Sequence, residues 1–153
     1  MLMLLFFAML GCKTVQSNDL AGTWIMKDSS RQVLPPELQK ASPKIVVDVN
    51  GTFVVSDMPG LFYFPGRRAA RLESGNGVWK LVSREGKQQV QLDFRVIANW
   101  KEANFPYGTQ LDVTRGWSAV TLFYFLGDAD EGRRIDFEKS RTERPPGVGV
   151  KQE

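Results

Sequence analysis

The chain contains 153 residues, of which 42% are hydrophobic and 24% charged, and its formal net charge is +3. This length suits a single domain with a buried core, and the composition is that of a globular protein. So small a charge surplus, with basic side chains clustered only at Arg67, Arg68 and Arg71, argues against a nucleic-acid-binding protein, which needs an extended basic face.

Histidine is absent and Cys12 is the single cysteine. The chain therefore lacks the commonest general base and metal ligand, and it cannot form an internal disulfide. The acidic run at residues 128–131 lacks the ligand series of an EF-hand loop and is expected to be a solvated turn. We expect no catalytic residues, no cofactor and no metal site.

Residues 1–11 form an uninterrupted apolar run that leads directly into Cys12. Such a run is too short to cross a hydrocarbon core of ~30 Å as a helix, which takes roughly 20 residues, and it has the length of a signal-peptide core. With Leu10-Gly11 before the cysteine, the segment resembles the signal peptide of a bacterial lipoprotein. The alternatives are an ordinary cleaved signal peptide, or an apolar segment with an incidental cysteine.

The lipoprotein resemblance implies a signal peptide over residues 1–11, a lipid on Cys12 and a polar tether over residues 12–18. It also implies that this lipid anchors the chain in the membrane of a bacterial cell envelope. Lys13 follows the cysteine, at the position where Asp favours the inner membrane. The resemblance therefore points to the outer membrane, on its periplasmic face.

The folded domain is expected to span residues 19–140 and to open with a strand over residues 20–27. Pro35 and Pro36 stand where the first turn of a helix tolerates proline, and good helix formers follow them. Pro43 ends this segment. We therefore expect a short helix or 3₁₀ segment after the first strand.

Two hairpins are predicted from turn residues that lie between alternating segments. Asn50-Gly51 joins residues 44–50 to residues 52–56, and Asn-Gly is the usual sequence of a type I′ turn. Glu85-Gly86-Lys87 joins residues 78–84 to a second segment in which every other residue is apolar. Because side chains alternate between the two faces of a strand, one face of this second segment is expected to be buried: Val90, Leu92, Phe94 and Val96.

Two long loops carry large aromatic side chains. Residues 57–66 contain two Pro-Gly pairs, which mark a loop, and residues 97–108 form the other. The first loop carries Leu61, Phe62, Tyr63 and Phe64, and the second carries Trp100, Phe105 and Tyr107. For the first loop, the favoured interpretation is that its apolar side chains fold back onto the core. The alternative is an apolar flap over the mouth of a cavity.

The remaining segments complete an all-β pattern. We expect a turn at residues 74–77, an acidic turn at residues 127–132 and a disordered tail over residues 141–153. Further strands are expected over residues 69–73, 109–114, 118–126 and 133–139. About eight short strands joined mainly by hairpin turns indicate a barrel or sandwich, and closing the sheet into a barrel removes its exposed edges.

Two Gly-x-Trp strands, Gly22-Thr23-Trp24 and Gly77-Val78-Trp79, resemble the opening motif of lipocalins and the wider calycin group. The resemblance implies an up-and-down antiparallel β-barrel of about eight strands, closed at one end by Trp24. It further implies that Arg133 on the last strand packs against the Trp24 ring. Residues 125–134 are also similar to a stretch found in small, uncharacterised bacterial lipocalin-like lipoproteins.

A barrel of this size either holds one small apolar ligand or is filled by its own side chains. We expect a protein that binds a small apolar or lipid-like ligand without catalysis. The residues expected at the mouth are Phe62, Tyr63, Phe64, Arg67, Trp100, Phe105 and Tyr107. The first alternative is an assembly lipoprotein with a filled barrel that docks a protein partner through an aromatic surface. The second is an enzyme with a polar cleft.

Overall fold

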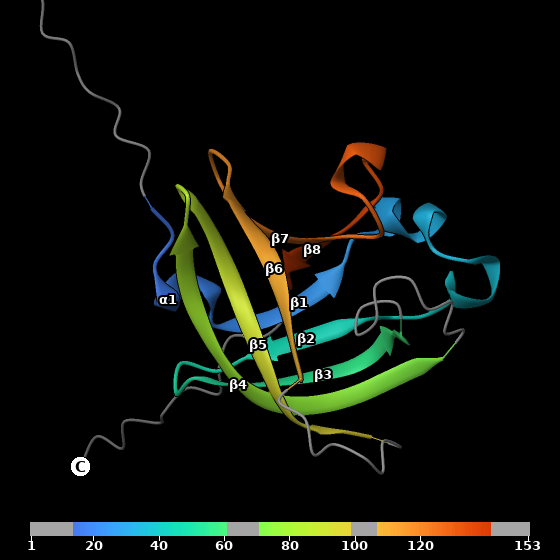
Figure 1. The fold of residues 1–153 in the computed structure, drawn as a ribbon, viewed down its shortest axis with the longest axis horizontal. Coiled ribbons are helices and arrows are strands. Elements are labelled where there is room, and N and C mark those ends of the chain that lie inside the picture. The colour runs from blue at the N-terminus through green and yellow to red at the C-terminus, as the bar shows by residue number, and fades with distance from the viewer. Residues whose placement is uncertain (1–13, 61–70, 99–106, 142–153) are drawn as a thin grey trace, which may run out of the picture.

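The computed structural model describes residues 14–60, 71–98 and 107–141, which form one closed barrel of eight antiparallel strands (Figure 1). Each strand pairs with the next along the chain and the last pairs with the first, so the predicted up-and-down order is confirmed. The strands are β1 (Gly22–Met26), β2 (Lys44–Val47), β3 (Thr52–Pro59), β4 (Leu72–Arg84), β5 (Lys87–Ile97), β6 (Tyr107–Arg115), β7 (Val120–Phe125) and β8 (Arg134–Lys139).

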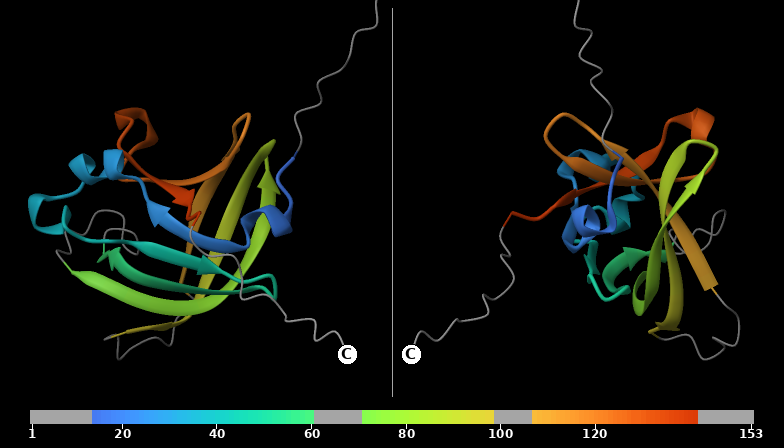
Figure 2. Two further views of the ribbon diagram at one scale, coloured as in Figure 1. Left: turned by 180° about the vertical axis from the view of Figure 1, so that it is seen from behind. Right: turned by 90° about the vertical axis from the view of Figure 1, so that its left-hand side faces the viewer.

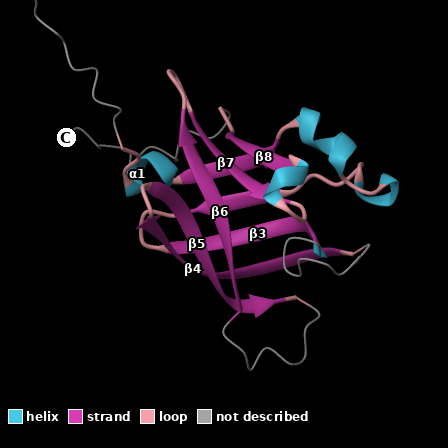
Figure 3. Ribbon diagram, turned by 45° about the horizontal axis from the view of Figure 1, so that its top comes forward, coloured by secondary structure: helices cyan, strands magenta, loops and turns pink. Residues whose placement is uncertain are grey.

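Helical structure in the described residues is limited to short segments at the two ends of the barrel (Figure 3). The predicted segment after the first strand is present as η2 (Pro36–Leu38), a 3₁₀ helix. The sequence did not predict α1 (Ser17–Leu20), which precedes β1, or the 3₁₀ helices η1 (Asp28–Val33) and η4 (Ala129–Glu131). Over the described ranges, no helix is long and apolar enough to cross a membrane.

The barrel domain begins earlier than the sequence indicates. Val15 is only 3% exposed and belongs to the core. Its backbone N–H donates to Gln88 Oε1 at 2.8 Å, and Gln88 Nε2 donates back to its carbonyl at 2.9 Å. Residues 14–18 of the expected tether are therefore part of the fold. A single apolar residue among polar neighbours gives no periodic pattern, so only its pairing with β5 reveals its place.

Both predicted hairpins are present, but their turns differ from the prediction. Glu85 (φ 51°) and Gly86 (φ 76°) both adopt positive φ, which makes the β4–β5 connection a two-residue turn of type I′. At the β2–β3 connection only Gly51 (φ 85°) does so, and the Asn50 N–H donates to Asp48 Oδ1 at 2.9 Å. The Asn-Gly pair therefore sits in a longer loop, in which glycine alone takes the left-handed position.

A bulge in β5 overturns one of the predicted buried positions. Gly77 pairs with Phe94 whereas Asn76 pairs with Val96, so β5 carries one extra residue at this point. The extra residue reverses the alternation: Val96 is 52% exposed and Ile97 is 4% exposed. The predicted burial of Val90, Leu92 and Phe94 is confirmed.

Two strands run further than the alternation predicts. β3 continues past Ser56 through a register shift at Asp57 (φ 53°), which buries Met58 completely. β6 begins at Tyr107, which the sequence assigned to a loop. Both extensions lie next to irregularities or loop residues, where a simple two-residue period cannot be followed.

The turn predicted at residues 74–77 is wrong, because these residues lie inside β4, a single long strand that curves around the barrel (Figure 1). Two glycines of this segment face inward. A Cβ on Gly77 would lie 2.0 Å from the Asp93 carbonyl oxygen and 2.9 Å from the Phe53 ring, and one on Gly75 would lie 3.1 Å from Phe94. The glycines thus admit Phe53 and Phe94, whose rings meet edge to face at 4.9 Å.

Large apolar side chains form the core of the barrel. Trp24, Phe53, Trp79, Leu92, Phe94, Leu122 and Phe137 are buried, and Tyr124 is half-buried. We call the end of the barrel where β1, β3, β5 and β7 begin the α1 end, and the end where these strands finish the loop end. η1, η2 and η4 lie at the loop end (Figure 3).

Candidate functional site

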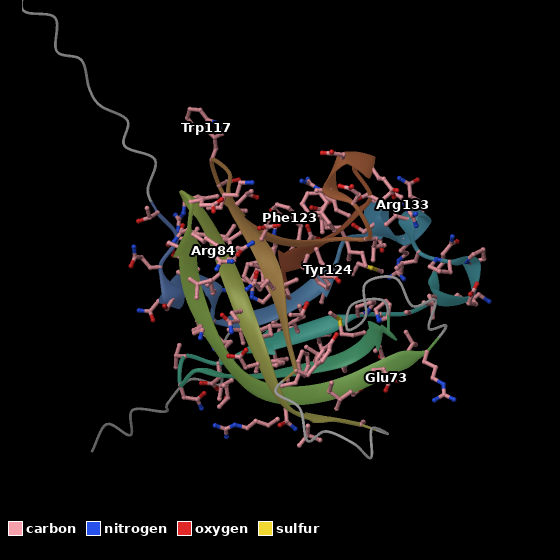
Figure 4. All side chains as sticks on the ribbon, in the orientation of Figure 1. Glu73, Arg84, Trp117, Phe123, Tyr124 and Arg133 are labelled. Atoms are coloured by element: carbon pink, nitrogen blue, oxygen red, sulfur yellow. The ribbon has the colours of Figure 1, made fainter. Side chains whose placement is uncertain are left out.

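The inner wall at the loop end carries polar side chains from three strands. Glu73 lies near the start of β4, Tyr107 and Thr109 lie at the start of β6, and Tyr124 lies near the end of β7. Each shares its face with buried neighbours on the same strand, which places it on the inner wall. Figure 4 shows Glu73 and Tyr124 on their separate strands towards this end. We call these four residues the loop-end cluster.

Glu73 is the residue of this cluster whose burial needs an explanation. The side chain is 6% exposed, and its register partner across the sheet is the fully buried Met58. Among the described residues its Oε2 atom is buried without a hydrogen-bond partner. A buried acceptor left unsatisfied costs about 1–3 kcal/mol, and more when it is charged. Such a cost persists at functional positions where a ligand supplies the missing donor.

The two tyrosines give this inner wall an amphipathic character. Burial, with a smaller contribution from the charge that Tyr124 would carry, raises the pKa of Tyr107 to about 12. Burial also raises the pKa of Tyr124. The Tyr107 ring lies 6.2 Å from the Phe94 ring, so the phenol is held against the aromatic core. Both phenols are neutral near neutral pH and provide hydroxyl groups among apolar surroundings.

A hollow lies on the surface between α1, the β6–β7 turn and the end of β8. It is a surface pocket of about 630 Å³. Arg115 forms an ion pair with Asp19 of α1, and Lys139 Nζ donates to the Asp19 carbonyl at 3.1 Å. The pocket lining also includes the fully exposed Trp117. This hollow combines basic groups with an exposed indole.

A backbone hydrogen bond and partial burial are the main influences on the pKa values of Asp19 and Lys139 in this pocket. The hydrogen bond from the Gln16 backbone, followed by the charge of Arg115, lowers the pKa of the Asp19 carboxyl. Partial burial lowers the pKa of Lys139, and the Asp19 charge opposes that shift. At neutral pH these groups are ionised, so the α1 helix is tied to β6 and β8 by charge-assisted contacts.

The partner of Trp24 is Lys139 rather than the predicted Arg133. Lys139 Nζ lies 5.9 Å from the centroid of the Trp24 ring, and Trp24 Nε1 donates to the Leu20 carbonyl at 2.7 Å. Arg133 lies just before β8 at the opposite end of the strand, exposed and 3.9 Å from Glu131. Positions 133 and 139 have the same parity, so the prediction chose the correct strand face but the wrong end.

Of the other structural residues predicted from the sequence, Trp79 is buried and its Nε1 donates to the Asp48 carbonyl at 2.8 Å. Tyr107 is half-buried on the inner wall, at the loop end. The remaining predicted ligand-binding residues and the predicted lipidation site lie outside the described residues: Phe62, Tyr63, Phe64, Arg67, Trp100, Phe105 and Cys12. The structure therefore leaves those predictions untouched.

Sequence reasoning missed Glu73, although a signal for it existed. Glu73 has the same parity as Gly75, Gly77 and Trp79. Once residues 72–84 are taken as one strand, this parity places the carboxyl on the inner wall. The expected turn at residues 74–77 interrupted the alternation and hid the relationship.

The acidic run forms a locally satisfied turn. Asp128 Oδ1 accepts the Asp130 N–H at 3.1 Å, and Arg134 pairs with Asp136 at 3.2 Å while lying 4.7 Å from the centroid of the Phe123 ring. In the described ranges no three metal-ligating side chains come together.

Comparison of the chain with protein-family models, with curated proteins and with solved structures finds no match.

Proposed function

We propose that this chain is an envelope-anchored, lipocalin-like lipoprotein that binds a small apolar or lipid-like ligand at the loop end of the barrel, without catalysis. One observation carries the proposal. Glu73 is buried on the inner wall of the barrel and has an acceptor atom without a partner among the described residues. A ligand that donates a hydrogen bond to Glu73 would remove the cost of that unsatisfied acceptor.

The surroundings of Glu73 define the kind of molecule that fits. The inner wall next to it consists of apolar and aromatic side chains, including Met58, Phe94 and Ile97. The matching ligand has an apolar body and a polar end with a hydroxyl or amine donor. An ammonium group fits best, because a hydrogen bond between opposite charges is stronger than a neutral one.

The envelope anchor rests on the sequence alone. The apolar residues 1–11, followed by Cys12, support a lipoprotein signal, and these residues lie outside the described ranges. The closed barrel of eight strands is compatible with a lipocalin-like fold. We place the chain on the periplasmic face of the outer membrane, because Lys13 rather than Asp follows the cysteine.

A second function is favoured by Trp117. This indole is fully exposed in the β6–β7 turn, where it contributes nothing to the core. A tight turn does not require a large aromatic residue. An exposed indole is typical of an interaction surface, which supports a lipoprotein that docks a partner with the barrel interior filled.

Native mass spectrometry of the protein extracted from its own membrane tests both parts of the proposal. We expect an acyl mass on Cys12 and a co-purifying small molecule that is lost in Glu73→Leu. The matched control is Glu138→Leu, which removes an exposed carboxylate from the outer wall of β8. Loss of the small molecule from both variants, or its absence from the wild-type protein, would contradict ligand binding at Glu73. An unmodified Cys12 would contradict the anchor.

A further inference from the structure

The α1 end of the barrel gathers segments that are far apart in the sequence. In an up-and-down barrel the β2–β3, β4–β5 and β6–β7 turns all lie at the end where the chain enters β1 and leaves β8. Figure 2 shows α1 and the end of β8 on this side of the molecule. Thr14, the first described residue, precedes Val15, which pairs with Gln88 at the α1 end.

An exposed indole and an excess of basic side chains distinguish this end. Trp117 at the tip of the β6–β7 turn is fully exposed, and Val49 in the β2–β3 turn is 73% exposed. The turns and strand ends carry five basic side chains and four acidic ones: Arg84, Lys87, Arg115, Lys139 and Arg141 against Asp19, Asp48, Glu85 and Glu138. Figure 4 shows Trp117 projecting away from the barrel.

Several of these groups also line the pocket beside Trp117. Its lining contains four basic and two acidic side chains, Lys27, Arg115, Lys139 and Arg141 against Asp19 and Glu138, of which Lys27 follows the loop end of β1. Because Asp19 is paired with Arg115, the remaining groups keep the hollow positively charged. Basic side chains with an indole match the interface of an anionic bilayer, where phosphates lie beside the apolar boundary that tryptophan prefers.

The anchor proposed above fixes how far this end can stand from a membrane. Cys12 and Thr14 are two residues apart, and a fully extended chain spans about 3.3–3.6 Å per residue. A lipid on Cys12 would therefore hold Thr14 within ~7 Å of the headgroup region. That is too short a tether to let the α1 end turn away from the bilayer.

We propose that the α1 end of the barrel is a membrane-facing surface that rests on anionic phospholipid, with Trp117 at the level of the headgroups. The basic side chains of the α1 end lie beside the lipid phosphates, and the loop end points away from the bilayer. This orientation rests on the proposed lipid anchor, but not on the proposed ligand. It leaves the loop end, where the ligand site is proposed, on the side of the aqueous phase.

Fluorescence quenching by brominated phosphatidylglycerol in vesicles tests the surface, using the full-length acylated protein. The emission of Trp117 is obtained by subtracting the fluorescence of the Trp117→Phe protein from that of the wild-type protein. We expect brominated lipid to remove most of that difference signal. In the control Trp79→Phe, the difference signal reports a buried indole, and we expect it to persist.

Two charge variants test the role of the basic groups. Arg84→Glu with Arg141→Glu should weaken the quenching of Trp117, whereas Arg133→Glu with Arg134→Glu at the loop end should leave it unchanged. Sedimentation with the vesicles while Trp117 stays unquenched would overturn the surface and leave the anchor intact. Failure of the protein to sediment with anionic vesicles would overturn both the membrane-facing surface and the lipid anchor. Glu73→Leu should not alter the quenching, so loss of the ligand site is distinguishable from either failure.

Discussion

The side chain of Lys139 lies across Gly22, so closely that a Cβ atom at position 22 would come within 2.6 Å of Lys139 Cε. From there Nζ reaches the Asp19 carbonyl at 3.1 Å and lies 5.9 Å from the centroid of the Trp24 ring. The end of the last strand is thereby connected to α1 and to the first strand. The glycine of the Gly22-Thr23-Trp24 motif serves this contact, and its φ of +130° suits glycine alone.

Gly22→Ala is expected to lower the free energy of unfolding by about 1–3 kcal/mol, because it combines a strained backbone with a close contact. Part of that loss should vanish when Lys139→Ala is present as well, since the contact is then absent. Urea unfolding of the two single variants and the double variant measures the coupling. A Gly22→Ala protein as stable as the wild type would refute this role of the glycine.

Gly77→Ala is expected to cost about 3 kcal/mol or more, because the new methyl group would meet the Asp93 backbone inside the sheet. Gly86→Ala is the matched control, since that glycine has φ +76° and open space around it. It should cost about 1–2 kcal/mol, from the left-handed backbone alone. Equal losses in the two variants would show that steric contact at Gly77 is unimportant.

The alternation of apolar residues predicted most of the strands and an all-β barrel or sandwich, because an antiparallel sheet with one buried face imposes a two-residue period. The two Gly-x-Trp strands favoured the barrel. The prediction failed where the backbone departs from that period. One extra residue in β5 turned Val96 outward and Ile97 inward. Nothing in the side chains of this segment marks the bulge, which depends on its pairing with β4.

Glycine misled the prediction in a second way. The sequence predicts a turn at Gly75 and Gly77, whereas in the structure they let Phe53 and Phe94 pack against a continuous strand. A turn glycine and a packing glycine are the same residue, and only the partner across the core separates the two cases. For the same reason the candidate site was only partly predictable. Tyr107 was named as a ligand-binding residue of a loop and lies in β6, and Glu73 was not named.

Alkaline pH is expected to destabilise the barrel through Tyr107. Its pKa is raised from 10.0 to about 12, chiefly by burial, so the folded state favours the neutral phenol. That contribution to stability is fully present below pH about 10, and it is lost as the pH rises towards about 12. The midpoint of urea unfolding should fall across this range, and less steeply in Tyr107→Phe. The same slope in both proteins would contradict the assignment.

Glu73→Leu is expected to raise the free energy of unfolding of the ligand-free protein by about 1–3 kcal/mol, because it removes a buried acceptor that lacks a partner. Glu73→Gln is the control, since it keeps a polar group at the same position without the charge. Its stability should lie between those of the wild-type and Glu73→Leu proteins. Chemical denaturation of the ligand-free proteins measures this order of stability. A Glu73→Leu protein less stable than the wild type would count against an unsatisfied carboxyl at Glu73.

Binding of two fluorescent probes tests the central claim most directly. Aminoanthracene and anthracene share an apolar body, and only the first carries a hydrogen-bond donor. If Glu73 accepts that donor inside the barrel, the wild-type protein should bind aminoanthracene about tenfold more tightly than anthracene, as a bond of ~1.4 kcal/mol requires. In Glu73→Leu the preference should disappear. Equal affinity of the wild-type protein for both probes, or a preference that survives in Glu73→Leu, would contradict a ligand site anchored at Glu73.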